Sequence, residues 1–546
     1  MDRDRAARSQ RAAAAAFAAY VLFGMIALVF VLADHRWFFR DDWAFLAGRD
    51  VSFDGLFQPH FDQHLSAVPV LVFRAMWSLF GAHSYVPYQL LIAVAHLSVV
   101  VLLRMLLRHL GVRPWLATGA AAILVLWGPA GGDNLTWAFQ VNFTGSISFG
   151  LAQLLLADRS GRVGPREVMA ATLGVLSVLS SAIGVTMVAV VGLALLLKHG
   201  WRTAAVQVTP AALVMLVWAI AMDPATESAA GPPPDIATTL RWIRWTYAGA
   251  IEGLGGHPVV VAVLIAVAAL GLALEVRAPT FSHFTGARDQ LRRRITAAAI
   301  PIALLLGSLF FAIVTARGRW IFGEAGARAG RYIYVIAVLM IPVLAIAAEA
   351  VSRRWPSARH AVLALLIMPI PLNLGGFDEP PFDARYFARQ EALLTGVVEM
   401  PLARQVPREN RPPGYDPTMG EGMTVGWLLD AHDGGKLPAA AGRLTPALRD
   451  ELTIRLTVTQ TQAVGPPSDA CPPLLLPTLL TPASGAEYRI TAPIVLTLEE
   501  PSGGARTRVV YRPGAGDTLR LEPAGAAVRA APLKKADSDA LCTASE

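Results

Sequence analysis

The feature that most limits the possible folds is a succession of long apolar runs, which fills the chain up to about residue 374. Hydrophobic residues make up 54% of the 546 residues and charged residues only 16%. A soluble globular protein does not normally carry so apolar a composition. A run of about 20 apolar residues is long enough to cross a bilayer as a helix. The sequence therefore predicts an all-α membrane bundle that crosses the bilayer many times.

About eleven runs are predicted to span the membrane, and several are shorter than an average span, which burial inside the bundle allows. They are residues 12–33, 85–107, 115–127, 143–156, 168–181, 184–197, 204–222, 257–274, 295–315, 332–351 and 361–374. Residues 65–81 are too short for a typical span and contain Pro69 and Arg74, so we expect a juxtamembrane helix there. An interfacial helix is expected at 236–251.

The positions of the basic residues predict the orientation of the bundle. Arg3, Arg5, Arg8 and Arg11 precede the first run, and later basic clusters fall on the same side of the predicted spans. Because basic loops stay in the cytoplasm, the N-terminus is predicted to be cytoplasmic. An odd number of spans places the C-terminus outside. We therefore expect a multi-pass protein of a bacterial plasma membrane. This topology also accounts for the net charge of +7, so nucleic acid is not an expected partner.

The chain changes character at about residue 375, where it becomes polar and rich in proline. This change divides the predicted membrane domain, 1–374, from an extracytoplasmic soluble domain, 375–546, that is β-rich from about 450. A helix is expected near 384–398, and strands are expected at 452–459, 487–498, 506–512 and 517–521. The two cysteines of the chain, Cys471 and Cys542, both lie in this domain, and an oxidising compartment would favour a disulfide between them.

The loop at 34–66 follows the first run and carries adjacent carboxylates, Asp41 and Asp42, flanked by Trp37, Phe38, Phe39 and Trp43. Aromatic residues anchor at the membrane interface, and desolvation there raises the pKa of a carboxylate toward that of a general base. Either aspartate is a candidate base. The alternative is that one of them caps the following helix or is simply solvated.

The same loop contains His60 and His64, which have the i, i+4 spacing of one helix face. If the segment is helical, they could bind a metal ion or a phosphate; the alternative is a polar lead into the juxtamembrane helix. The chain lacks HExxH and paired CxxC motifs, so no metal cofactor is predicted, and a divalent metal is not excluded. Walker, GxGxxG and GxSxG motifs are not convincingly present, which argues against ATP-driven, dinucleotide-dependent and hydrolase functions.

Four arginines stand on the predicted outer side against the general charge trend, namely Arg317, Arg319, Arg328 and Arg331. Arginine side chains match the geometry of phosphate oxygens. For three of them, pairing with Glu324 or with lipid headgroups is the favoured interpretation. Arg331, beside Tyr332 at the entrance of a predicted span, is the one selected as a ligand.

The order of these features resembles the GT-C superfamily of membrane glycosyltransferases. The resemblance spans about 12–374 and rests on the aspartate pair after the first span, the juxtamembrane helix, the outer segment WAFQVNF and the outer Arg331-Tyr332 before a late span. It implies transfer of a sugar from a polyprenyl-phosphate donor to a glycan, lipid or protein acceptor of the cell envelope, on the outer face of the membrane. Direct displacement would invert the anomeric carbon.

Within this resemblance, Asp41 or Asp42 would deprotonate the acceptor hydroxyl. Arg331, with His60 and His64 as further candidates, would stabilise the phosphate. Trp137 and Gln140 would contact the sugar or the acceptor, although packing within the polar loop explains them equally well. Neither the sugar nor the acceptor is specified by the sequence.

Other classes of membrane protein remain open at this point. A transporter or a lipid flippase would be expected to carry ionisable groups near the middle of the membrane. Most charges here lie at the ends of the predicted spans and in outer loops, which favours an enzyme. A polysaccharide polymerase would use the same lipid-linked substrates but would carry its key residues in a large late outer loop. A structural membrane subunit is a further alternative.

Overall fold

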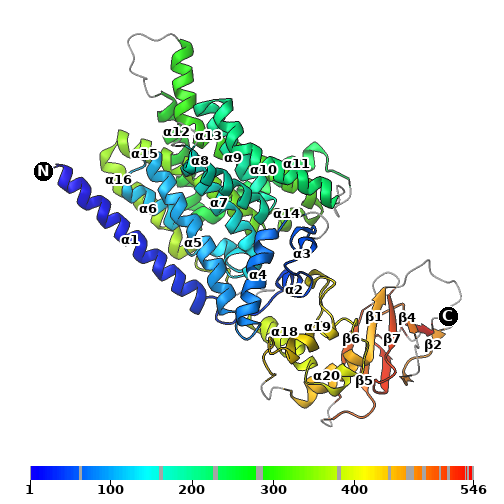
Figure 1. Ribbon diagram of the computed structural model, residues 1–546. Helices are drawn as coiled ribbons and strands as arrows, with labels where there is room; N and C mark the ends of the chain where they lie inside the picture. Colours follow the sequence, from blue (N-terminus) through cyan, green and yellow to red (C-terminus); the bar gives the residue numbers. More distant parts are fainter. Residues whose placement is uncertain are drawn as a thin grey trace. The chain divides into compact units, whose positions relative to one another are not determined.

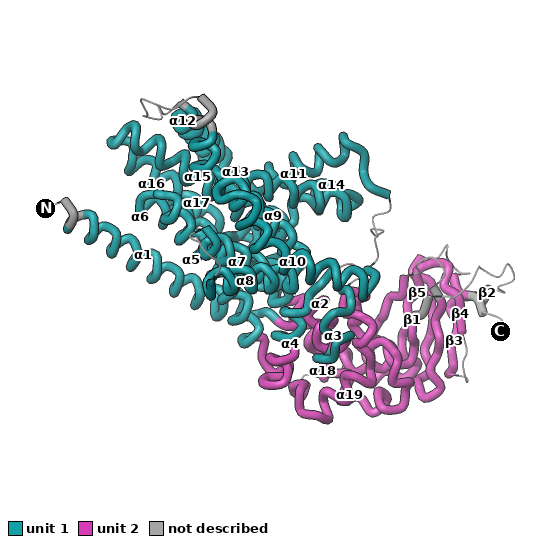
Figure 2. The backbone as a smooth tube through the Cα atoms, turned by 45° about the horizontal axis from the view of Figure 1, so that its top comes forward, with its two compact units in different colours: residues 1–36, 50–73, 86–383 teal, residues 37–49, 74–85, 384–546 magenta. Residues whose placement is uncertain are grey.

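The computed structural model describes residues 2–60, 64–158, 164–224, 232–277, 287–377, 383–440, 444–462, 473–482, 487–502, 506–512, 517–534, 537 and 540–543. Contacts divide the chain into two compact units, which Figure 2 shows in different colours. Unit 1 comprises Met1–Arg36, Asp50–Phe73 and Val86–Asp383, and unit 2 comprises Trp37–Arg49, Arg74–Tyr85 and Ala384–Glu546.

In its described residues, unit 1 consists mainly of helices (Figure 1). The helices are α1 (Asp2–Phe30), α3 (Phe53–Phe57), α5 (Val86–His109), α6 (Pro114–Ala122), α7 (Val141–Ala157), α8 (Pro165–Ser180), α9 (Ile183–His199), α10 (Trp201–Met222), α11 (Ile236–Gly255), α12 (Pro258–Arg277), α13 (Ala287–Arg319), α14 (Gly323–Ala327), α15 (Gly330–Arg354), α16 (Arg359–Ile367) and α17 (Pro369–Leu372). The short 3₁₀ helices are η1 (Gly128–Ala130), η3 (Ala138–Gln140), η4 (Trp320–Phe322) and η5 (Pro356–Ala358), and η2 (Gly131–Leu135) is a π-helix. Helix α4 (Ala67–Phe80) begins in unit 1 and ends in unit 2.

Several helices of unit 1 are long and apolar enough to cross a membrane, as a membrane protein requires. Within the described ranges there are six, namely Ala6–Phe30, Val86–His109, Trp201–Met222, Pro258–Val276, Arg292–Ala327 and Gly330–Arg354. The other five predicted spans overlap α6, α7, α8, α9 and the α16–α17 pair, and none of these is longer than 17 residues. Each predicted run is therefore helical, and six of the runs have the length of a membrane span.

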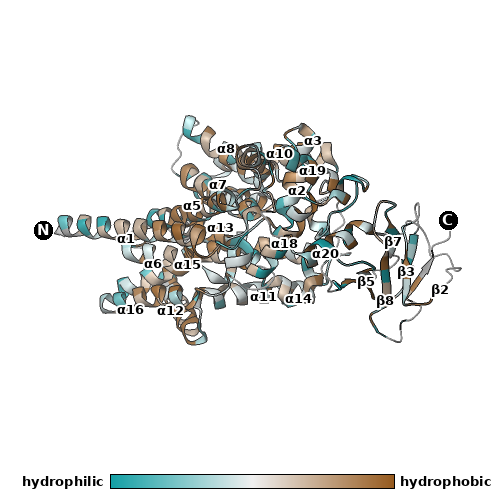
Figure 3. Ribbon diagram, turned by 90° about the horizontal axis from the view of Figure 1, so that it is seen from below, coloured by the Kyte–Doolittle hydropathy of each residue, from teal (hydrophilic) through white to brown (hydrophobic). Residues whose placement is uncertain are grey.

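Helix α15 lies at the centre of unit 1. It packs against α11, α12 and α13, and 83% of its apolar window is buried. Tyr334, Val335 and Ile336 are completely buried in consecutive positions, as expected for a helix that is apolar on all sides. Figure 3 shows the hydrophobic colouring concentrated on the helices of unit 1, with a hydrophilic start to α1.

The chain between α6 and α7 leaves helical geometry while remaining buried. The Gly128 N–H donates to the carbonyl of Asn373 at 2.8 Å, and the Gly132 N–H donates to the carbonyl of Gly376 at 3.0 Å. A Cβ on Gly128 would lie 1.7 Å from the Gly375 carbonyl oxygen, so only glycine permits this approach. Irregular backbone in an apolar environment needs such partners, and these bonds fix the segment that carries η1, η2 and η3.

Unit 2 combines helices with two antiparallel sheets. Its helical elements are α2 (Asp41–Ala47), α18 (Ala384–Val397), η6 (Pro401–Arg404), η7 (Pro417–Met419), α19 (Val425–Asp433) and α20 (Pro446–Thr457). Its strands are β1 (Val458–Gln462), β2 (Pro473–Leu474), β3 (Thr478–Leu480), β4 (Glu487–Ile490), β5 (Ile494–Leu498), β6 (Val509–Tyr511), β7 (Asp517–Leu521), β8 (Val528–Pro532) and β9 (Leu541–Thr543).

The two sheets form a sandwich around one apolar core. Their strand orders are β1-β7-β4-β9-β2 and β3-β8-β5-β6, with every pairing antiparallel. Leu519 and Leu541 of the first sheet share this core with Leu496 and Val528 of the second and with Ile454 of α20. The β-rich C-terminal region expected from the sequence is therefore present.

The first predicted strand of the C-terminal region begins later than expected. Residues 452–457 were expected to be a strand but form the end of α20, because Thr445 caps this helix through the Leu448 N–H at 3.2 Å and Pro446 occupies its first turn. The strand begins only at Val458. Cys471 and the side chain of Cys542 lie outside the described residues, and the disulfide stays a prediction.

The boundary between the units differs from the predicted one at residue 374. Residues 37–49 and 74–85, expected in the membrane domain, belong to unit 2. Their aromatic side chains explain this, because Trp43 and Trp77 both pack against Trp427, with ring centroids 6.0 and 5.3 Å apart. The Ala82 N–H also donates to the carbonyl of Lys436 at 2.7 Å. The aspartate pair is therefore held by the C-terminal region.

Candidate active site

The aspartate pair occupies the first turn of α2, and Asp42 is fixed there by hydrogen bonds. Its side chain is completely buried. The Phe39 N–H and the Tyr85 hydroxyl both donate to Asp42 Oδ2, at 2.9 and 3.0 Å. Charge-assisted bonds of this kind hold a carboxylate in one orientation. Asp42 thus stabilises the turn that leads into α2, but it does not cap this helix, because the N-cap position is Arg40 and no side chain caps α2.

Asp41 follows a residue with an unusual backbone conformation. Arg40 has φ 42° and ψ −110°, in the left-handed region that non-glycine residues rarely adopt. Its guanidinium lies over the Phe39 ring at 4.9 Å, and its Nε is 3.8 Å from Asp416 Oδ2. Such strain persists only where the surroundings impose it, and it is typical of functional sites. Here it sets the direction in which the chain enters α2 at Asp41, which is 8% exposed.

Aromatic rings surround the aspartate pair inside unit 2. Phe38 contacts Trp43 and Tyr85, with ring centroids 5.1 Å apart in both cases. Phe39 packs edge-on against Tyr386 at 5.4 Å. The aromatic residues on either side of the pair are therefore packed inside unit 2, and Asp41 and Asp42 are buried with them.

We expect Tyr85→Phe to lower the free energy of unfolding by about 1.5–3 kcal/mol, because the buried Asp42 carboxylate loses a hydrogen-bond donor. Thermal unfolding of the purified protein measures the change. Tyr415→Phe is the control, because Tyr415 is a half-buried tyrosine of the same unit, and it should change stability by less than about 0.5 kcal/mol. Equal effects of the two variants would contradict the role given to Tyr85.

His60 and His64 do not lie on a helix. The prediction that they share one helix face, on which the metal site depended, is therefore wrong. They form an isolated antiparallel bridge, in which the N–H of each donates to the carbonyl of the other, at 2.8 and 3.0 Å. Asp62, between them, lies outside the described residues. The His60 ring is buried and lies 5.5 Å from the ring of Phe139. The bridge thus brings His60 and His64 directly opposite each other.

Arg319 lies beside this bridge and was not selected as a ligand from the sequence. Its Nη2 is 3.3 Å from His64 Nε2, an acceptor when the ring is neutral. Burial, together with the positive charge of Arg319 and the neighbouring His60, lowers the pKa of His64 to about 4. His64 is therefore neutral at pH 7 and can accept from the guanidinium. Arg319, His64 and His60 form a cluster suited to an anion.

The shifted pKa of His64 predicts a pH-dependent stability. The unfolded chain protonates His64 below about pH 6.5, whereas the folded chain keeps it neutral down to about pH 4, so stability falls as the pH is lowered between these values. We expect His64→Gln, which keeps an acceptor for Arg319, to remove at most about 3 kcal/mol of this pH dependence.

Melting temperatures measured from pH 7 to pH 4 test this prediction. His257→Gln is the matched control, because His257 is an exposed histidine of the same unit, and it should retain the slope of the wild type. An unchanged slope in His64→Gln would show that His64 is not held neutral.

Arg331, the arginine selected from the sequence, is ion-paired. Its Nη1 donates to Asp133 Oδ1 at 2.8 Å, and its backbone N–H donates to Asp133 Oδ2 at 3.0 Å. Arg328 is paired with Glu252 at 2.6 Å and with Glu324 at 2.8 Å, as the pairing interpretation expected. The pairing of Arg331 was not foreseen, because Asp133 is remote in sequence. Much of its charge is neutralised by that carboxylate.

Trp137 and Gln140 lie on the irregular segment next to the histidines. Trp137 packs against Phe139, with ring centroids 5.2 Å apart, and Phe139 in turn contacts His60. Gln140 and Asn134 are completely buried, and neither side-chain amide has a hydrogen-bond partner among the described residues. Buried amides without protein partners call for water or a polar ligand. The segment therefore offers polar contacts beside an aromatic surface.

The candidate residues divide between the units. Asp41 and Asp42 belong to unit 2, whereas His60, His64, Trp137, Gln140, Arg319 and Arg331 belong to unit 1. Within the described part of the chain, no group of three or more His, Cys, Asp or Glu side chains is arranged to hold a metal ion. No protein-family model, curated protein or solved structure matches the chain.

Proposed function

We propose that the chain is a GT-C-like glycosyltransferase of the plasma membrane, with about eleven spans, a cytoplasmic N-terminus and an extracytoplasmic C-terminal domain. It transfers a sugar from a polyprenyl-phosphate donor to a cell-envelope acceptor on the outer face. One observation carries the proposal. A buried aspartate pair follows the first long apolar helix, and Asp42 is held there by the Phe39 N–H and the Tyr85 hydroxyl.

The hydrogen bonds of the pair favour Asp41 as the base. Asp42 Oδ2 is engaged with Phe39 and Tyr85, so it serves best as a fixed structural carboxylate. Asp41 is placed in the same turn by the strained backbone of Arg40. Its carboxylate would accept the proton of the acceptor hydroxyl during attack. One base is sufficient, because the phosphate leaving group departs as an anion and needs no proton.

The proposed reaction is a direct displacement. The acceptor oxygen forms a bond to the anomeric carbon while the bond from that carbon to the phosphate oxygen breaks. The bonding electron pair leaves with polyprenyl phosphate, and the acceptor proton passes to Asp41. The configuration of the anomeric carbon is inverted.

The leaving phosphate requires positive charge and hydrogen-bond donors. Within unit 1, we propose that Arg319, supported by neutral His64 and by His60, is the group that binds a phosphate, in preference to Arg331. Arg319 contacts an uncharged imidazole, whereas Arg331 is neutralised by Asp133. Gln140 and Trp137 are assigned to the sugar or the acceptor, because Gln140 has unused polar atoms and Trp137 lies on the same short segment.

A donor panel tests the proposed activity. Membranes from cells that produce the chain are incubated with polyprenyl phosphates carrying radiolabelled hexoses or pentoses, and membranes from cells with an empty vector serve as the control. We expect chain-dependent movement of the label from the lipid to an acceptor for at least one donor, with release of polyprenyl phosphate. Absence of chain-dependent transfer across the panel would contradict the proposal.

A further inference from the structure

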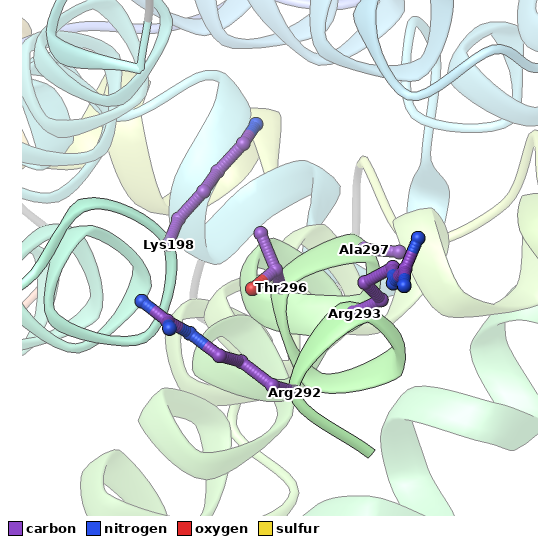
Figure 4. Close-up of a pocket in the computed structure, with 5 residues that line it drawn as sticks. All are labelled: Lys198, Arg292, Arg293, Thr296 and Ala297. Atoms are coloured by element: carbon purple, nitrogen blue, oxygen red, sulfur yellow. The ribbon is translucent and has the colours of Figure 1, made fainter. Parts of the chain in front are cut away.

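A cavity of about 510 Å³ lies between α9 and α13 in unit 1 and is not used by the proposed reaction. It is lined by Lys198, Arg292, Arg293, Thr296 and Ala297. Figure 4 shows Lys198 on one helix and the other four residues on the second helix, with the two arginines extending to opposite sides of Thr296. The lining is therefore rich in cations and includes one hydroxyl.

The cavity lies where both helices change from apolar to basic sequence. Lys198 belongs to the last turn of α9, whose preceding residues are apolar. Arg292 is the first residue of the apolar stretch Arg292–Ala327, which is long enough to cross a membrane. This change of composition places the cavity at the level of the lipid headgroups.

The two arginines supply the charge that is available in this cavity. Lys198 Nζ pairs with the buried Asp158 at 2.6 Å, and His109 bonds the same carboxylate at 2.5 Å. Burial alone would raise the pKa of Asp158, but the hydrogen bonds from Lys198 and His109 lower it below its ordinary value. The Lys198 charge is thus neutralised. Among the described side chains, Arg292 and Arg293 have no ion-pair partner.

We infer that this cavity binds the phosphate group of an anionic phospholipid. An arginine side chain donates paired N–H bonds to phosphate oxygens, and because Thr296 lies between Arg292 and Arg293, one phosphate can engage the Thr296 hydroxyl together with either arginine. Basic pockets between membrane helices recognise anionic headgroups in this way. The neighbouring apolar stretch of α13 gives the acyl chains a surface to follow, which a soluble phosphate would not use. The inference goes beyond the proposed transfer reaction and does not depend on it.

Lipid binding by the full-length protein tests the inference. Purified, delipidated protein in neutral detergent is titrated with phosphatidylglycerol, phosphatidylcholine or inorganic phosphate, and bound lipid and melting temperature are measured. The test variant is the double substitution Arg292→Gln and Arg293→Gln. The control is Arg353→Gln with Arg354→Gln, an adjacent arginine pair at the end of α15, where Arg353 pairs with Glu275 and Arg354 lies over Trp355 at 5.3 Å.

We expect phosphatidylglycerol to bind and stabilise the wild type and the control, and to bind the test variant about 30-fold more weakly. Equal binding to the test variant and the control would overturn the site. Equal binding of phosphatidylcholine would overturn the need for an anionic lipid. Stabilisation by inorganic phosphate as large as that by the lipid would overturn the lipid as the source of the phosphate.

Discussion

Asp41→Asn is expected to reduce sugar transfer by about 10²- to 10⁴-fold, while leaving the melting temperature close to that of the wild type. The substitution keeps the size and polarity of the side chain but removes its ability to accept a proton. The measurement is the initial rate of transfer with purified protein at saturating donor. The large effect should appear in kcat, because proton transfer occurs in the transition state.

Asp54→Asn is the matched control for this experiment. Asp54 stands in the first turn of α3, another short helix of the same loop, but its side chain is exposed. We expect it to retain nearly full activity. A rate for Asp41→Asn within about threefold of the Asp54→Asn rate would contradict Asp41 as the base.

Asp42→Asn separates the two carboxylates of the pair. An asparagine carbonyl oxygen still accepts from the Phe39 N–H and the Tyr85 hydroxyl, although without the charge that strengthens these bonds. The account therefore expects a loss of stability for this variant and a smaller loss of kcat than for Asp41→Asn. The reverse order of kcat losses would move the base to Asp42.

Arg319→Gln is expected to lower kcat by about 10²- to 10³-fold, the usual effect of removing one donor to a developing anion. Arg319→Lys keeps the charge but not the paired N–H groups, so it should recover part of the rate. A purely structural role of the contact with His64 would instead appear as a lower melting temperature with little change in kcat.

Arg317→Gln provides the control, because Arg317 lies two residues away on the same helix and is exposed. It should change the rate by less than about threefold. If Arg317→Gln and Arg319→Gln reduce kcat equally, the assignment of the phosphate to Arg319 is wrong, and the general positive charge of this segment explains both effects.

Local sequence signals were sufficient for much of the helical architecture. The apolar runs coincide with helices because a membrane environment makes hydrophobicity the dominant local constraint. Helix α18 closely matches the helix expected near 384–398, whereas the capping alternative for the aspartate pair is wrong, because Arg40 is the N-cap of α2 and no side chain caps it. Strand β7 was predicted at its observed bounds, because alternating residues between glycines and prolines mark a short strand.

Contacts between residues distant in sequence could not be predicted from local sequence signals. Arg319 and His64 are separated by 255 positions, and no local pattern distinguished Arg319 from the other outer arginines. The ion pair of Arg331 with Asp133 could not be predicted either, because these two residues are also distant in sequence. The i, i+4 spacing of His60 and His64 was misleading, because two residues that pair across a β-bridge can have the same spacing as residues on one helix face.

Reconstitution into liposomes tests the central claim most directly, because it separates chemistry from transport. Purified protein is reconstituted with a polyprenyl-phosphate donor that carries a radiolabelled sugar, and an acceptor extract from the cell envelope is added outside. We predict that the label appears in the acceptor, that an equal amount of polyprenyl phosphate is formed, and that Asp41→Asn lowers both by at least about 10²-fold. Label that crosses the bilayer while still attached to the lipid would contradict the glycosyltransferase account and identify a flippase.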